Sequence, residues 1–383
     1  MSKKSVKKVL SFLISRIPFF KERTKSRKIQ PEDHRVPDNL ASYMISEILQ
    51  EIFTHLADTF VFNGTYDLHA YSNLYSCVLV NRHWCRNAMI ILWRQPFHPC
   101  LNTGYIIVNT LLTFLDEEER NFLLSQGITH LPPSLTSKTY LFDYPIYFRH
   151  LHQQKLYFSV ESWSQKNLQN KPNNATNLLM NSLLKLIYKK SGQLVRLKLY
   201  NLVGLIKDNM DYKNHQDSTV DSSYIYKFIS QVKQLTINGT YENSNMFLLP
   251  LFSHLCTNVQ HLCIEHFSIA KNIDCVIKSQ TNLVSLEISN LSGHSTSIIQ
   301  SILSQSKSLR NIKFYKVNFS ECCQWTSIAF CKKLEMLEIY DCLNLNSFMI
   351  LPLITTKFPL LKRICILGNN DLECWIKNYM SRN

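Results

Sequence analysis

The sequence predicts an α/β protein in which a small N-terminal helical module precedes a solenoid with a parallel concave sheet. Three observations lead to this prediction. An apolar triplet recurs along the C-terminal half, segments with helical apolar spacing separate its copies, and a distinct helical periodicity covers residues 36–97. Since one repeat alone cannot bury its apolar edge, the repeated units must stack and share one core.

The triplet has the form Leu-x-x-Leu-x-Leu, with Val, Ile or Phe in some copies. Its seven first positions are Leu194, Val232, Val259, Leu283, Leu309, Leu334 and Leu361, at spacings of 38, 27, 24, 26, 25 and 27 residues. A short strand with a helical return needs about 20–29 residues, the period of leucine-rich repeats. The polar residues 208–223 lengthen the first interval and are expected to form an inserted loop. We therefore predict a leucine-rich-repeat solenoid over residues 181–375.

The residues between and beside the apolar strand positions should point onto the concave face, because strand side chains alternate between faces. Candidates for contacting a protein substrate on this face are Arg196, Lys198, Tyr200, His261, Glu265, Lys313, Tyr315, Glu338, Tyr340 and Arg363. A mixed polar and aromatic face suits a large partner. A solvated face without a ligand is the open alternative, because every solenoid has such a face.

The composition limits the possible functions. The chain of 383 residues, 45% of them apolar, is long enough for two or three globular units. Its twelve cysteines include no C-x-x-C pair, which favours a reduced intracellular compartment, cytoplasmic or nuclear. No apolar run reaches the roughly 18 residues that a membrane span needs.

The sequence offers little for catalysis or for a cofactor. Its glycines are isolated, so no Gly-rich phosphate loop is expected. His254, Cys256, His261, Cys263 and His266 lie close in sequence, but their spacing does not fit a tetrahedral metal site. Because no set of nucleophile, base and orienting residue can be assembled either, we expect a protein that is not an enzyme and binds no cofactor or metal.

The first 35 residues form a basic tail that we expect to be disordered. They contain eleven Lys or Arg against three acidic residues, which gives +8 of the total net charge of +14. Val6, Leu10, Leu13, Ile17 and Phe20 would share one helical stripe. Three interpretations remain open: a solvated tail, a nuclear import or nucleic-acid patch, and a helix on an anionic membrane. Nucleic-acid binding by the folded body is not expected.

Residues 36–97 predict a small module of three helices. Ile45, Ile48, Leu49, Ile52, Phe53 and Leu56 have the spacing of one helical face. Asn63-Gly64 is a turn signal, a short apolar helix is expected over 74–80, and a third over 81–93 ends before Pro96. Three helices in about 60 residues bury little surface, so the module should dock onto a partner.

The run Glu47-Ile48-Leu49, Ile52-Phe53 and Leu56, followed by Leu79-Val80-Asn81-Arg82-His83-Trp84 and Leu92-Trp93, resembles an F-box. The Leu-Pro pair of the family falls on Met44-Ile45, and the linker over 57–73 is longer than usual. F-box proteins bind a Skp-family adaptor and so join an SCF-type cullin-RING ubiquitin ligase, and many carry leucine-rich repeats that hold the substrate.

The resemblance implies a set of adaptor-binding residues: Met44, Ile45, Ile48, Leu49, Ile52, Phe53, Leu56, Leu74, Val80 and Trp84. Some of them must close the three-helix core, and the remainder should face the adaptor. Residues 98–180 are expected to be a helical linker region between module and solenoid. The function expected from the resemblance is substrate recognition for an SCF-type ligase. The alternatives are a repeat scaffold without a ligase link and a helical cap on the solenoid.

Overall fold

The computed structural model describes residues 45–58, 61–62, 65–66, 68–97, 104–134, 141–168, 172, 174–200, 229–239, 249–267, 272–293, 295–320 and 322–368. Within these ranges, only the backbone is described at residues 58, 61–62, 65–66, 68–72 and 251. The basic tail, the residues expected to form an inserted loop and Met44 lie outside these ranges. The chain forms two compact units: one from residues 1–102 and 142–148, the other from 103–141 and 149–383.

The first unit contains three helices, α4 (Ser46–Asp58), α5 (Leu68–Val78) and α6 (Arg82–Leu92). Asn81 caps α6, because its side-chain oxygen accepts a hydrogen bond from the Trp84 backbone N–H at 2.8 Å. Phe53 of α4 packs its ring against the Trp84 edge, with centroids 5.4 Å apart. The three helices thus enclose an aromatic core of their own.

Two additional segments belong to the first unit. Strands β1 (Val61–Phe62) and β2 (Thr65–Tyr66) pair antiparallel on either side of residues 63–64, where the sequence predicted a turn. The 3₁₀ helix η1 (Tyr144–Tyr147) lies far along the chain, yet Tyr144 stacks on Trp93 with ring centroids 4.3 Å apart. The region expected to be a linker therefore contributes residues 142–148 to the first unit.

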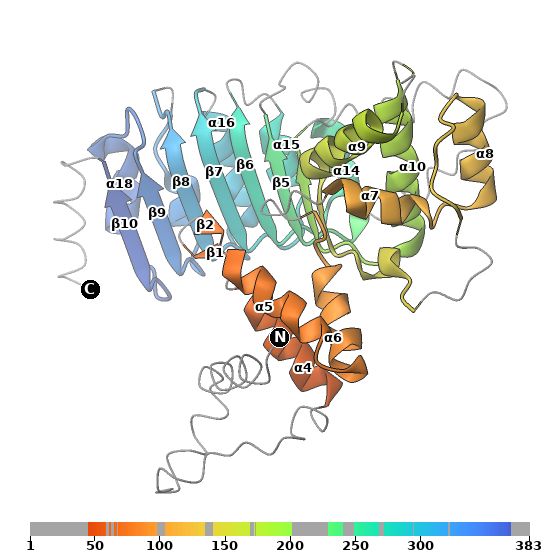
Figure 1. Ribbon diagram of the computed structural model, residues 1–383. Helices are drawn as coiled ribbons and strands as arrows, with labels where there is room; N and C mark the ends of the chain where they lie inside the picture. Colours follow the sequence, from red (N-terminus) through yellow and green to blue (C-terminus); the bar gives the residue numbers. More distant parts are fainter. Residues whose placement is uncertain are drawn as a thin grey trace, which may run out of the picture. The chain divides into compact units, whose positions relative to one another are not determined.

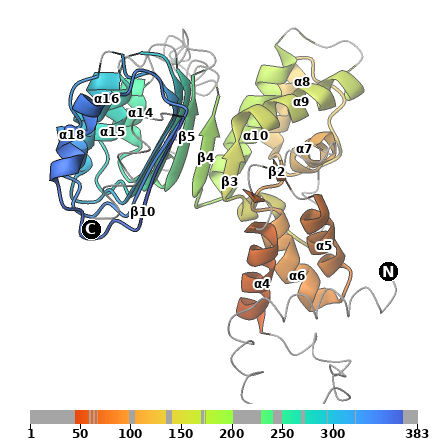
Figure 2. The same cartoon turned by 90° about the vertical axis from the view of Figure 1, so that its left-hand side faces the viewer.

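The second unit is built on an open sheet of eight parallel strands in the order β10-β9-β8-β7-β6-β5-β4-β3 (Figures 1 and 2). The strands are β3 (His150–His152), β4 (Arg196–Leu199), β5 (Gln234–Asn238), β6 (His261–Phe267), β7 (Ser285–Leu291), β8 (Asn311–Val317), β9 (Met336–Tyr340) and β10 (Arg363–Leu367). The predicted α/β class with a parallel sheet is confirmed, and the seven apolar triplets coincide with β4 to β10.

The eighth strand, β3, was not predicted. The sequence indicated helical packing for this region, because three residues with Leu151 as their single buried side chain are too short to show a strand period. The strand forms because its neighbour supplies the ladder: the Arg149 carbonyl accepts hydrogen bonds from the N–H groups of Val195 and Arg196, at 2.8 and 3.0 Å. The sheet therefore begins 44 residues before the first triplet position, at His150 rather than Leu194.

Short helices cover one face of the sheet (Figure 2): α14 (Leu249–Leu255), α15 (Ile273–Lys278), α16 (Ser295–Ser301), η3 (Ile302–Gln305), α17 (Thr326–Ala329) and α18 (Ser347–Thr355). A buried glutamine, Gln305, bonds backbone groups of the neighbouring strand–helix repeat. Gln305 donates to the carbonyls of Ile277 and Gln280 at 3.0 and 2.9 Å and accepts from the Leu283 N–H at 3.3 Å. A buried polar group without a hydrogen-bond partner is costly, so these three bonds stabilise the contact between consecutive strand–helix repeats.

In four consecutive strands, β6 to β9, the residue after the same register position has a left-handed backbone conformation, with a positive φ angle. His266, Asn290, Lys316 and Asp341 have φ angles of 59°, 52°, 53° and 52°. Each follows one of the aligned residues Glu265, Ser289, Tyr315 and Tyr340. Histidine, asparagine and aspartate tolerate this backbone comparatively well, so Lys316 is the exception in the row.

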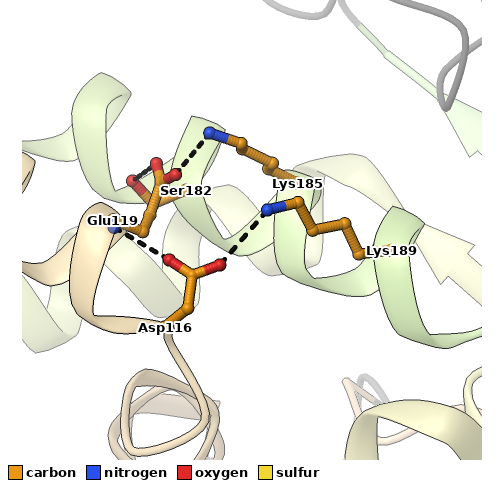
Figure 3. Close-up of polar contacts among 5 residues, drawn as sticks. All are labelled: Asp116, Glu119, Ser182, Lys185 and Lys189. Atoms are coloured by element: carbon orange, nitrogen blue, oxygen red, sulfur yellow. Dashed lines mark hydrogen bonds and ion pairs between the residues drawn. The ribbon is translucent and has the colours of Figure 1, made fainter. Parts of the chain in front are cut away.

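Four helices pack at the β3 end of the second unit: α7 (Gly104–Leu112), α8 (Glu117–Ser125), α9 (Gln153–Asn167) and α10 (Ala175–Lys190). A polar network joins α8 to α10 (Figure 3). The buried Glu119 carboxylate accepts from Ser182 at 2.8 Å and pairs with Lys185 at 2.6 Å. Asp116 caps α8 through the Glu119 N–H and pairs with Lys189 at 3.2 Å. The buried carboxylate is therefore paired and hydrogen-bonded.

Candidate partner-binding surfaces

The sheet face opposite α14–α18, here called the polar face, carries rows of side chains in register. Its central row is His152, Lys198, Thr236, Cys263, Glu287, Lys313, Glu338 and Cys365. In β4, β6, β7 and β8 these residues alternate with buried apolar ones, as the sequence predicted. The strands therefore place in one row side chains that are up to 213 residues apart in the chain, from His152 to Cys365.

The charged residues of the polar face form ion pairs between strands. Lys313 of β8 pairs with Glu287 of β7 at 2.8 Å. Arg363 of β10 pairs with Glu338 of β9 at 3.2 Å. Because cations and carboxylates neutralise one another along these strands, the polar face offers fixed, oriented charges rather than a field of one sign.

At the β3 end of the polar face, Lys198, Glu265 and Tyr200 come together. Lys198 reaches across β5 to Glu265 on β6, with Nζ 3.0 Å from Oε2, and its ammonium lies 5.4 Å from the Tyr200 ring centroid. His152 stacks on the same ring at 5.2 Å. Burial alone would raise the pKa of Glu265, but the Lys198 charge and the hydrogen bonds from Lys198, Asn238 and Cys263 together outweigh burial and hold that pKa below its usual range.

Two histidines of this face have lowered pKa values. Burial, with the nearby charges of Lys198 and Lys155, lowers the pKa of His152 to about 4. Burial and the Arg196 charge lower the pKa of His261. The surroundings of both imidazoles therefore favour the neutral form. Burial also raises the pKa of the Cys263 thiol, so this cysteine lacks the thiolate character of a nucleophile.

The structure places all ten residues predicted for substrate binding in or directly after a polar-face strand. Lys198, Tyr200 and Glu265 are brought together, and so are Glu338 and Arg363. Tyr315 and Tyr340 are register neighbours on β8 and β9. Arg196 donates to Gln234 at 2.5 Å, and His261 lies in the same row. His152 of the polar face was missed, because its strand was not predicted; Glu287 has the outward spacing predicted for this face but was not among the ten candidates.

In the first unit, the predicted adaptor-binding residues divide into two groups. Six of them are buried in the core between the helices: Leu49, Ile52, Phe53, Leu56, Leu74 and Trp84. These six are the members of the predicted set that close the core, and their side chains are not exposed in the folded unit. Val80 is partly buried against the same core, and Met44 lies outside the described residues.

Ile45 and Ile48 of the predicted set are exposed, at 58% and 36% of their surface. Two more large apolar side chains are exposed here although they were not predicted: Tyr75 at 64% and Leu79 at 70%. The helical period could have identified both, because it places Tyr75 and Leu79 on a different side from Leu74 and Cys77, which are buried in the core. The exposed apolar group, in α4 and α5 and directly beside their ends, therefore consists of Ile45, Ile48, Tyr75 and Leu79.

No three histidine, cysteine, aspartate or glutamate side chains among the described residues are arranged to hold a metal ion. Within the same ranges, no helix is both long enough and apolar enough to cross a bilayer. Comparison with family models, curated proteins and solved structures finds no match to this chain.

Proposed function

We propose that the chain is the substrate-recognition adaptor of an SCF-type cullin-RING ubiquitin ligase. Helices α4–α6 act as an F-box that binds a Skp-family adaptor, and the polar face of a leucine-rich-repeat solenoid binds the target protein. The observation that supports this function best is the exposed apolar group, Ile45, Ile48, Tyr75 and Leu79, beside a core that is already complete. Exposed apolar side chains on a small, complete unit are typical of a protein interface.

The separation between core and exposed residues gives the proposal its energetic basis. Leu49 and Phe53 are fully buried, so the unit can fold without its partner, and the exposed side chains remain available to it. Burying an isoleucine or leucine at an interface stabilises a complex by about 1.5–3 kcal/mol. Two such side chains would therefore account for roughly 100-fold or more in affinity.

The decisive experiment measures binding of a purified Skp-family adaptor to the full chain by titration calorimetry. Ile48→Glu with Leu79→Glu should weaken the complex by roughly 100-fold or more, because both charges would have to lose their water in the interface. The control is Arg82→Ala with Arg86→Ala, two exposed positions on α6. Far-ultraviolet circular dichroism of both variants verifies that the helices are retained.

A repeat scaffold without a ligase link is the second candidate. Met44-Ile45 at the position of the family's Leu-Pro pair favours it. Replacing these two residues by Leu-Pro should strengthen adaptor binding or leave it unchanged, since proline is tolerated at the start of a helix. If the natural chain shows no binding and the Leu-Pro variant gains it, the ligase role is wrong and the scaffold function replaces it.

A further inference from the structure

The N-terminal ends of β8, β9 and β10 carry a concentration of positive charge that the proposed function does not use. The turns entering these strands contain six exposed cations and a single carboxylate, Glu335, and so a net charge of +5. The cations are Lys307, Arg310, Lys332, Lys333, Lys357 and Lys362. Because the strands are parallel and in register, these turns lie along the same edge of the sheet, here called the basic edge (Figure 1).

The charge is specific to this end of the second unit. The corresponding turns before β5, β6 and β7, at residues 230–233, 257–260 and 281–284, contain one cation, Lys233, and no acidic residue. Beyond residue 35 the whole chain carries a net charge of only +6, since +8 of the total +14 lies in the first 35 residues. The basic edge thus accounts for most of the charge excess outside the tail.

The few charge pairs at this edge do not neutralise it. Glu335 lies between Arg310 and Lys362, at 2.5 and 2.6 Å, so one carboxylate serves two cations. Among the residues that the structure describes, no carboxylate pairs with Lys307, Lys333 or Lys357. Their ammonium groups therefore remain available to an external anion, which is opposite to the paired charges of the polar face.

Large apolar side chains are exposed among these lysines. Phe330 is 61% exposed and precedes Lys332 by two residues. Leu360 is 46% exposed and lies between Lys357 and Lys362. The Lys332 ammonium lies 6.0 Å from the ring centroid of Phe358, so the aromatic and basic side chains of adjacent turns are in contact range.

We infer that the basic edge binds the surface of anionic phospholipid bilayers. A bilayer is flat and presents many phosphate and carboxylate groups, which suits several turns aligned along one edge. Exposed Phe and Leu side chains between lysines can enter the interfacial layer of the bilayer, as the apolar residues of surface-bound helices do. A nucleic acid or an acidic peptide would use the lysines but leave Phe330 and Leu360 without a role.

Co-sedimentation of the full chain with phosphatidylcholine vesicles, with and without about 30% phosphatidylserine, tests this inference. Lys307→Glu with Lys332→Glu and Lys333→Glu should lower binding to the anionic vesicles by 10-fold or more. The matched control makes the same change of net charge elsewhere in the second unit, by Lys155→Glu with Lys166→Glu and Lys316→Glu, and should change binding less than threefold. Phe330→Ser with Leu360→Ser should reduce the binding that persists at high salt.

If the two triple variants lose vesicle binding equally, the inference is wrong, because binding then depends on the net charge of the chain and not on the basic edge. Retained binding in the edge variant would also overturn it and would assign the contact to another part of the chain, such as the basic tail. If an RNA or an acidic peptide, but no vesicle, binds in an edge-dependent way, that partner class replaces the bilayer. Adaptor affinity, measured on the same variants, should not change, so failure here is distinct from failure of the proposed function.

Discussion

Lys316 shows how a single residue can oppose the conformation that its position requires. It occupies the left-handed position at which the neighbouring units have His266, Asn290 and Asp341. This backbone costs a non-glycine residue about 1–2 kcal/mol, and glycine would lose about 0.5–1 kcal/mol through chain entropy. Lys316→Gly should therefore stabilise the protein by about 0.5 kcal/mol in urea unfolding.

Asn290→Gly is the matched comparison, because asparagine tolerates the same backbone and should gain less from the change. The cation of Lys316 also lies 5.1 Å from the Tyr315 ring centroid, a contact that the glycine variant loses. A clear destabilisation by Lys316→Gly would show that this contact outweighs the backbone strain.

At the scale of one element, His152 joins β3 to α9 and makes the join sensitive to pH. Its Nδ1 accepts a hydrogen bond from the Lys155 N–H at 3.4 Å and so caps α9. The unfolded chain binds a proton at this imidazole below about pH 6.5, whereas the folded protein does so only near pH 4. The free energy of unfolding should therefore fall as the pH is lowered from about 6.5 to 4, by about 3 kcal/mol from this group.

His152→Asn is the variant that isolates this effect, because asparagine keeps a capping oxygen and does not titrate. Urea unfolding of both proteins across this range should give a shallower pH dependence for the variant. Parallel curves for the two proteins would show that His152 does not carry the predicted proton linkage.

At the scale of the whole molecule, two surfaces are expected to act independently, one in each compact unit. Tyr315 and Tyr340 are register neighbours on the polar face, beside the Glu338–Arg363 pair. Tyr315→Ala with Tyr340→Ala should reduce recovery of a target protein by 10-fold or more, since aromatic side chains contribute much of the binding energy at interfaces. Adaptor binding should be unchanged, because it depends on the first unit.

Affinity purification followed by mass spectrometry provides this measurement, with target and adaptor peptides counted in the same sample. Lys278→Ala on α15, on the opposite side of the sheet from the polar face, serves as a control substitution away from both surfaces. Unchanged target recovery in the tyrosine variant would move the target site to another part of the second unit.

The sequence by itself determined the second unit's class and the face on which each strand residue lies. Triplets such as Leu286-x-Ile288 repeat at an interval that fits one strand and one return, and the alternation of strand side chains follows from backbone geometry alone. For the same reason Lys313 and Tyr315 could be placed on the polar face before their neighbours were known. These properties depend on local periods, which a single sequence contains.

Only the tertiary structure decided which residues meet. The apolar face of α4 did not reveal that Leu49 and Phe53 close the core while Ile48 stays exposed, because that division depends on how α5 and α6 pack against it. Strand β3 exists because β4 provides its hydrogen-bond partners. Lys198 pairs with Glu265, 67 residues away, because the stacking of the strand–helix repeats sets the register of their strands. Long-range packing fixes these contacts, and no local period encodes it.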